Sequence, residues 1–116
     1  MIRCIGTELY SRKDELKHGV ESVYFGGGTP SLLTLKELSF LMDNIYSSYR
    51  VLSNAEITIE ANPENITDSS VAKWKKAGFN RLSIGLQSFK ESDLKWMNRG
   101  HTAQDNLSAI SRAKKA

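Results

Sequence analysis

The sequence predicts an α/β fold in which parallel strands alternate with helices. The first observation is the order of its periodic segments, which runs helix, strand, helix, strand, helix, strand, helix, helix; this repeat builds parallel sheets through right-handed crossovers. The second is a composition of 40% apolar and 25% charged residues over 116 residues, typical of one soluble globular domain with a modest core. The third is that a glycine loop, Glu60 and Gln87 each follow a different strand, and ligands bind beyond the carboxyl ends of parallel strands.

The composition excludes several classes of protein. The net charge is +3, and part of it comes from basic residues on expected helices, which are Lys73, Lys75, Lys76, Arg112, Lys114 and Lys115. Such residues are typical of solvated helix faces, so we predict no nucleic-acid partner. No apolar stretch approaches the roughly 20 residues that cross a bilayer, and the start lacks a secretion signal, so we expect a cytoplasmic protein. Cys4 is the one cysteine; alone it makes neither an internal disulfide nor a metal site, and we expect a buried thiol.

The first predicted elements are a helix and a strand. The helix is indicated by apolar residues at helical spacing, which are Ile2, Ile5, Leu9 and Leu16. No capping residue precedes it, and we expect it to end at Gly19. The apolar, β-branched and aromatic segment Glu21–Phe25 then predicts a buried strand.

A glycine-rich loop follows this strand. Gly26–Gly28 allow positive φ and close approach of another molecule to bare backbone. Pro30 ends strand pairing because it has no N–H. Two interpretations stay open from these residues alone: an ordinary strand-to-helix turn, or a loop that binds a ligand.

The second helix and second strand have clear signals. Thr34 and Glu37 have the spacing of a capping box. The inner face of this helix is predicted to carry Leu38, Leu41, Met42, Ile45 and Tyr49. The segment Glu56–Glu60 alternates isoleucine with polar residues, which predicts a strand whose isoleucines face the helices. Thr58 and Glu60 are then expected on the opposite face.

The third helix is predicted to begin at Thr67 as its N-cap, to turn Val71 and Trp74 inward, and to stop at Gly78. The segment Arg81–Gly85 then predicts the third strand.

Two helices are predicted after the third strand. Ser88 and Glu91 have capping-box spacing before a short helix that runs to about Asn98, and Thr102 is expected to cap the last helix. The inner side of this last helix is predicted to be Leu107, Ile110 and Ala113.

Four segments together resemble a known family. They are Tyr24–Leu32 (YFGGGTPSL), Ile59–Pro63 (IEANP), Arg81–Phe89 (RLSIGLQSF) and Asn98–His101 (NRGH). The sequence resembles the radical S-adenosylmethionine proteins of the oxygen-independent coproporphyrinogen III oxidase family, and most of all their haem-chaperone branch. The resemblance implies that residues 1–116 form part of a radical S-adenosylmethionine core domain, a (β/α)6-type partial TIM barrel.

The resemblance also implies a set of cofactor-binding residues. Gly27, Gly28 and Thr29 would present backbone and hydroxyl groups to the amino group of S-adenosylmethionine, and Glu60 would accept hydrogen bonds from its ribose hydroxyls. Taken alone, Glu60 is more typical of a surface carboxylate beside a lysine or an arginine.

Gln87 would hold the same sugar, and Arg99 would pair with the methionyl carboxylate through two parallel hydrogen bonds. Without the resemblance, Arg99 is a cation near the end of a helix. His101 is interpreted as a structural histidine rather than a haem ligand.

The sequence departs from the family at its iron–sulfur site. Family members carry a C-x-x-x-C-x-x-C motif that holds a [4Fe–4S] cluster, and this chain has Cys4 alone. A closed barrel also needs about 200 residues or more, so we expect a piece of a larger protein that lacks the cluster loop and the C-terminal remainder. Its parent would act on a porphyrinogen or on haem.

Two other classes of function are kept open. The chain could be a small β/α module that binds a nucleotide or an anion on its glycine loop. It could also be an inactive fragment that associates with a second copy through exposed sheet edges.

Overall fold

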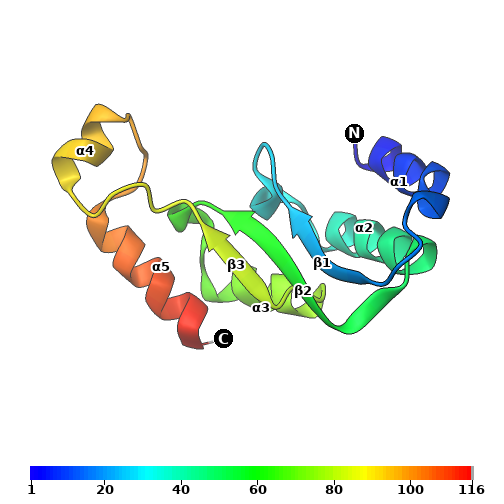
Figure 1. Cartoon of the computed structure of the whole chain (residues 1–116). Coiled ribbons are helices and arrows are strands. Elements are labelled where there is room, and N and C mark those ends of the chain that lie inside the picture. Colours follow the sequence, from blue (N-terminus) through cyan, green and yellow to red (C-terminus); the bar gives the residue numbers. More distant parts are fainter. Residues whose placement is uncertain (116) are drawn as a thin grey trace.

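A computed structural model describes residues 1–115 and has the predicted order of elements (Figure 1). The helices and strands are α1 (Ile2–Ser11), β1 (Val20–Phe25), α2 (Leu35–Ser48), β2 (Val51–Ala61), α3 (Asp68–Lys76), β3 (Arg81–Ile84), α4 (Glu91–Trp96) and α5 (Ala103–Lys115). Short 3-10 turns lie at Lys13–Glu15, Pro30–Leu32 and Pro63–Asn65.

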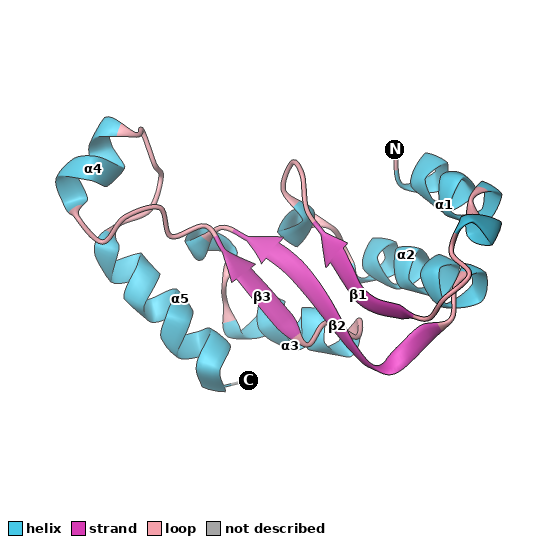
Figure 2. Ribbon diagram, viewed as in Figure 1, coloured by secondary structure: helices cyan, strands magenta, loops and turns pink. Residues whose placement is uncertain are grey.

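The described strands form one parallel sheet with the order β1-β2-β3 (Figure 2). Phe25 pairs with Ile59 on β2, and Glu60 on β2 pairs with Ser83 on β3. Because all three strands run the same way, their carboxyl ends and the loops that follow lie at one end of the sheet. The parallel β/α prediction is confirmed.

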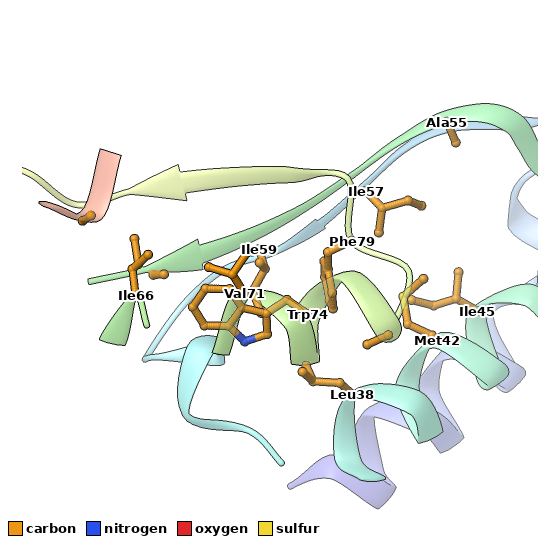
Figure 3. Close-up of a cluster of buried hydrophobic side chains, with 13 residues drawn as sticks. Leu38, Met42, Ile45, Ala55, Ile57, Ile59, Ile66, Val71, Trp74 and Phe79 are labelled. Carbon is orange, nitrogen blue, oxygen red and sulfur yellow. The ribbon is translucent and has the colours of Figure 1, made fainter. Parts of the chain in front are cut away.

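The core lies between the sheet and helices α2 and α3 (Figure 3). Ile57 and Ile59 of β2 are buried, as predicted, and pack in one cluster with Leu38 of α2 and Trp74 of α3. Thr58 is buried as well, at 1% exposure, although it lies on the other face of the strand.

Three predicted helix starts are confirmed, and at α5 the Thr102 hydroxyl accepts from the Asp105 N–H while the Asp105 carboxylate accepts from the Thr102 N–H. The Thr34 hydroxyl oxygen accepts from the Glu37 N–H, and the Glu37 carboxylate accepts from the Thr34 N–H, which makes a capping box at α2. Thr67 caps α3, where Ser70 completes the box. Gly78 follows that helix with φ of +99°, a conformation suited to glycine.

The capping box predicted for Ser88 and Glu91 is wrong. Lys90 is the N-cap of α4, and the Ser88 hydroxyl accepts from the Lys90 N–H while it donates to Asp93. The Glu91 carboxylate instead accepts from the N–H of Ala103, at the start of α5. A long-range partner therefore replaces the local one.

The predicted limits of α1 and β2 are wrong. Helix α1 ends at Ser11, well before Gly19, because the chain turns at Arg12, where φ is −102°. Strand β2 starts at Val51 rather than Glu56, since Val51 already pairs with Val20 before a register shift in the ladder. Tyr49 follows α2 as its C-cap and donates its hydroxyl proton to the Leu9 carbonyl.

Three predictions of burial are also wrong. Strand β1 has no fully buried residue, because it lies at an edge of the described sheet, and Tyr24 is 55% exposed. Cys4 is exposed on α1. On α5 the buried residues are Asn106 and Ala109, whereas Leu107 is 54% exposed.

Candidate functional site

A hollow of about 210 Å³ lies at the carboxyl ends of the strands. The residues that line it are Gly28, Thr29, Glu60, Ala61, Asn62, Ser83, Ile84, Gly85 and Gln87. They come from the ends of β1, β2 and β3, so the parallel sheet brings together residues that are far apart in the sequence.

Glu60 is held in place from two sides. Its Oε1 accepts a 2.7 Å hydrogen bond from the Tyr24 hydroxyl, and its Oε2 accepts a 3.2 Å bond from the N–H of Gly27. A carboxylate offers about four acceptor positions. Glu60 therefore keeps acceptor capacity toward the hollow while its orientation is fixed.

The three positions of the glycine loop require glycine for different structural reasons. Gly27 and Gly28 have φ of +79° and +60°, and a Cβ atom at either would meet no atom within 4 Å. Their backbone is thus open to solvent and to a ligand. At Gly26, by contrast, a Cβ would lie 2.7 Å from the Tyr24 ring, so this position needs glycine for packing.

Gln87 reaches the hollow from a turn after β3. It has φ of +63°, which is uncommon for a residue other than glycine. Gly85 precedes it, and a Cβ there would lie 3.4 Å from both Asn62 Oδ1 and Gln87 Nε2. The sequence between β3 and α4 therefore folds so that an amide side chain borders the hollow.

Arg99 lies next to the hollow without lining it. Its Nη2 donates to Oδ1 of Asn62 at 3.4 Å, a long and weak hydrogen bond. Its Nε is buried and has no hydrogen-bond partner within the described residues. The guanidinium is thus close to a wall of the hollow and not fully satisfied.

Three residues at this site were not predicted from the sequence as site residues: Tyr24, Asn62 and Ser83. The Tyr24 hydroxyl donates to Glu60 and lies 3.3 Å from the Ser83 hydroxyl. Ser83 pairs with Glu60 across the sheet, in a register that the sequence alone does not set.

The residues present do not fit an iron–sulfur cluster. Within residues 1–115 no group of three or more His, Cys, Asp and Glu side chains could hold a metal ion, and Cys4 is exposed on α1. His101 is buried, with Nε2 3.2 Å from the Leu86 carbonyl oxygen, which suits a structural histidine. No helix in this part of the chain is long and apolar enough to cross a membrane.

Fold and site together define a β/α-repeat protein whose candidate site lies beyond the carboxyl ends of parallel strands. The sequence matches the Radical SAM superfamily over residues 8–116, and the chain belongs to this superfamily.

Sequence comparison with individual proteins shows which members of the superfamily this chain is similar to. The chain is 41% identical to "Heme chaperone HemW" of Escherichia coli over 86 residues, which cover 74% of the chain and 23% of that protein. It is 40% identical to bovine "Radical S-adenosyl methionine domain-containing protein 1, mitochondrial" over 96 residues, or 83% of the chain and 22% of that protein.

A solved structure supports the same family. The coproporphyrinogen III oxidase HemN of Escherichia coli, described as a radical SAM enzyme, matches 98% of this chain with a TM-score of 0.84 and 27% identity. The match covers 26% of the oxidase chain. The chain therefore corresponds to a segment of HemW- and HemN-like radical SAM proteins, spans about a quarter of their length, and has the fold of their partial barrel.

Proposed function

We propose that the hollow is one wall of a binding site for S-adenosylmethionine. The observation that carries this proposal is the Glu60 carboxylate, which is anchored by Tyr24 and Gly27 beside an open glycine backbone. A carboxylate at a strand end is well suited to accept hydrogen bonds from the two ribose hydroxyls of a nucleoside. The hollow is smaller than the roughly 300 Å³ or more of complete ligand pockets, which supports one wall rather than a whole site.

The other predicted residues have matching chemistry. Gly28 and Thr29 line the hollow beside Glu60 and would offer backbone and hydroxyl oxygens to the methionyl amino group. Gln87 would contact the sugar from the loop that follows the neighbouring strand β3. Arg99, with its unpartnered Nε, would bind the methionyl carboxylate as a planar, two-pronged donor.

S-adenosylmethionine, when bound, supplies a sulfonium group whose one-electron reduction begins radical chemistry. The role of this chain is to orient that cofactor by its sugar, amino and carboxylate groups. We further propose that the full-length protein acts in haem metabolism, on a porphyrinogen or on haem, because its relatives include a haem chaperone and a coproporphyrinogen oxidase.

Isothermal titration calorimetry with S-adenosylmethionine and the full-length protein that contains this chain tests the proposal. Glu60→Gln removes the charge that accepts from the sugar, and we expect affinity to fall about tenfold or more, since a hydrogen bond to a charged group contributes about 1.5–3 kcal/mol. Glu56→Gln is the matched control, because Glu56 lies on the same strand and pairs with Arg81 away from the hollow.

Two results would contradict the proposal. If the wild-type protein does not bind S-adenosylmethionine, the proposed function is wrong. Binding that is equally strong in Glu60→Gln and wild type, and that inorganic phosphate competes away, would favour an anion-binding loop instead.

A further inference from the structure

The turn that carries Gln87 is held from outside the sheet. Ile84 O accepts from the Leu86 N–H at 2.9 Å, and Leu86 O accepts from the Ser88 N–H at 2.8 Å. These two tight turns place Gln87 at φ of +63°. A glutamine in this left-handed conformation is less favourable than in the common regions, so surrounding contacts must maintain it.

Asn106 of α5 supplies those contacts. Its side-chain Nδ2 donates to Leu86 O at 3.0 Å and to Ser88 O at 2.8 Å. One amide group thus binds the carbonyls on both sides of Gln87. Asn106 is fully buried, at 0% exposure, so water does not compete for these bonds.

The orientation of the Asn106 amide follows from its neighbours. Its Oδ1 is buried without a hydrogen-bond partner among the described residues, which is unfavourable for an acceptor. Rotating the amide by 180° would place that oxygen against two carbonyl oxygens, which is worse. The Asn106 side chain is therefore fixed by its donor bonds to the turn.

His101 reinforces the same turn. It is buried, and its Nε2 lies 3.2 Å from Leu86 O, the carbonyl that Asn106 also contacts. Both residues come after α4, so the segment that ends in α5 folds back onto the end of β3 and fixes its loop.

We infer that Asn106 is a positioning residue, which holds the backbone of Gln87 so that the Gln87 side chain borders the hollow. The inference rests on the proposed binding of S-adenosylmethionine and adds a residue outside the hollow to that site. Without the two donor bonds, the turn would relax toward negative φ, and the Gln87 amide would leave the wall it shares with Glu60 and Thr29.

A double-mutant cycle in the full-length protein tests this inference. Asn106→Leu keeps the approximate volume and removes both donor bonds, and Gln87→Ala removes the side chain they position. We expect each single variant to weaken S-adenosylmethionine binding about fivefold to tenfold, and the double variant to bind no more weakly than Gln87→Ala alone. Additive losses, or an unchanged affinity in Asn106→Leu, would overturn the inference.

Ala109→Gly is the matched control for general damage to α5. Ala109 is equally buried on the same helix, and glycine destabilises a helix without touching the Gln87 turn. We expect its affinity to stay near the wild-type value. If Asn106→Leu does not fold, Asn106→Ser, which keeps a single donor, takes its place in the cycle.

A second measurement separates this inference from the proposed function. Amide hydrogen exchange of Ser88, whose N–H donates to Leu86 O, should accelerate in the Asn106 variant and not in Ala109→Gly when no cofactor is present. If wild type does not bind S-adenosylmethionine, the proposed function fails, and Ser88 exchange still decides whether Asn106 holds the turn. Unchanged exchange overturns the inference.

Discussion

The Tyr24 hydroxyl donates a 2.7 Å hydrogen bond to Oε1 of Glu60, across neighbouring parallel strands. The register explains this contact, because Tyr24 pairs with Thr58 and its long side chain reaches the residue two positions further along β2. Tyr24 also lies 3.3 Å from the Ser83 hydroxyl on β3. One side chain thus connects the ends of all three strands and fixes the carboxylate that borders the hollow.

Tyr24→Phe tests whether this hydrogen bond preorganises Glu60. The variant keeps the ring and removes the donor, so Glu60 gains freedom that must be lost again on binding. We expect affinity for S-adenosylmethionine to fall about fivefold, which corresponds to about 1 kcal/mol for one hydrogen bond. Calorimetry measures the change; tighter binding by the variant would show that Tyr24 competes with the ligand for the carboxylate.

Gly27→Ala should destabilise the protein through its backbone alone. The left-handed conformation at φ of +79° costs a residue with a side chain about 1–2 kcal/mol, and no neighbour within 4 Å adds a clash. Gly100→Ala is the control, because a Cβ there also meets nothing and its φ lies outside the left-handed range. Denaturant unfolding of both variants gives the comparison; equal stabilities would contradict the argument.

The chain's local patterns predicted most of the fold. Alternation in β2 and the capping box at Thr34 are read from neighbouring residues, and the structure confirms both. The carboxyl ends of parallel strands lie at the same edge of a sheet. The order of the elements was therefore enough to predict that Glu60 and Gln87 lie near the glycine loop.

Contacts that depend on the register between distant segments could not be predicted. The bond from Tyr24 to Glu60 spans 36 residues, and nothing in the spacing of β1 and β2 sets which residues pair. Asn106 was missed for the same reason. Its neighbours Asp105 and Leu107 give no sign of a distant partner, yet α5 turns Asn106 toward two backbone carbonyls of a distant loop.

The helix caps predict a dependence of stability on pH. Hydrogen bonds from the N–H and then the hydroxyl of Thr34 hold the pKa of Glu37 below its ordinary value of 4.5, and Thr102 does the same for the pKa of Asp105, ordinarily 3.8. A lowered pKa in the folded state means that this stabilisation is present above those ordinary values and is lost as the pH falls through the lowered ones.

The double variant Glu37→Gln/Asp105→Asn should therefore lose less stability than wild type when the pH drops from 6 to about 3. Thermal melting at several pH values measures this slope. Glu21→Gln, which removes a carboxylate from an exposed position in β1 rather than at a helix start, controls for the loss of a negative charge. Parallel curves for the double variant and wild type would contradict the prediction.

Asn80 extends the sheet before β3 begins. Its Oδ1 accepts from the Ile57 N–H at 2.8 Å, and its Nδ2 donates to Ala55 O at 2.9 Å. Asn80→Ala leaves both backbone groups of β2 unpaired, and we expect a loss of about 2 kcal/mol in the free energy of unfolding. Asn80→Asp keeps the acceptor for Ile57 but turns a carboxylate oxygen toward the Ala55 carbonyl oxygen, so we expect it to lose at least as much stability at neutral pH. Denaturant unfolding measures both losses, and an unchanged stability of Asn80→Ala would contradict the prediction.

Arg99 offers the most specific test of how the cofactor would bind, because its proposed partner is a single chemical group. Within residues 1–115 the Arg99 side chain donates a weak 3.4 Å hydrogen bond to Asn62, and its Nε has no partner, so a carboxylate would satisfy the guanidinium. We expect Arg99→Ala to weaken S-adenosylmethionine binding about tenfold or more. Arg99→Lys should recover only part of the loss, since an ammonium cannot form two parallel bonds.

Decarboxylated S-adenosylmethionine tests the contact with the carboxylate directly, because this analogue lacks that group. If Arg99 binds the carboxylate, Arg99→Ala should leave the affinity for the analogue almost unchanged. Arg3→Ala, at an exposed position on α1, controls for the loss of one positive charge. Equal losses for both ligands in calorimetry would place the effect of Arg99 elsewhere, through its contact with Asn62.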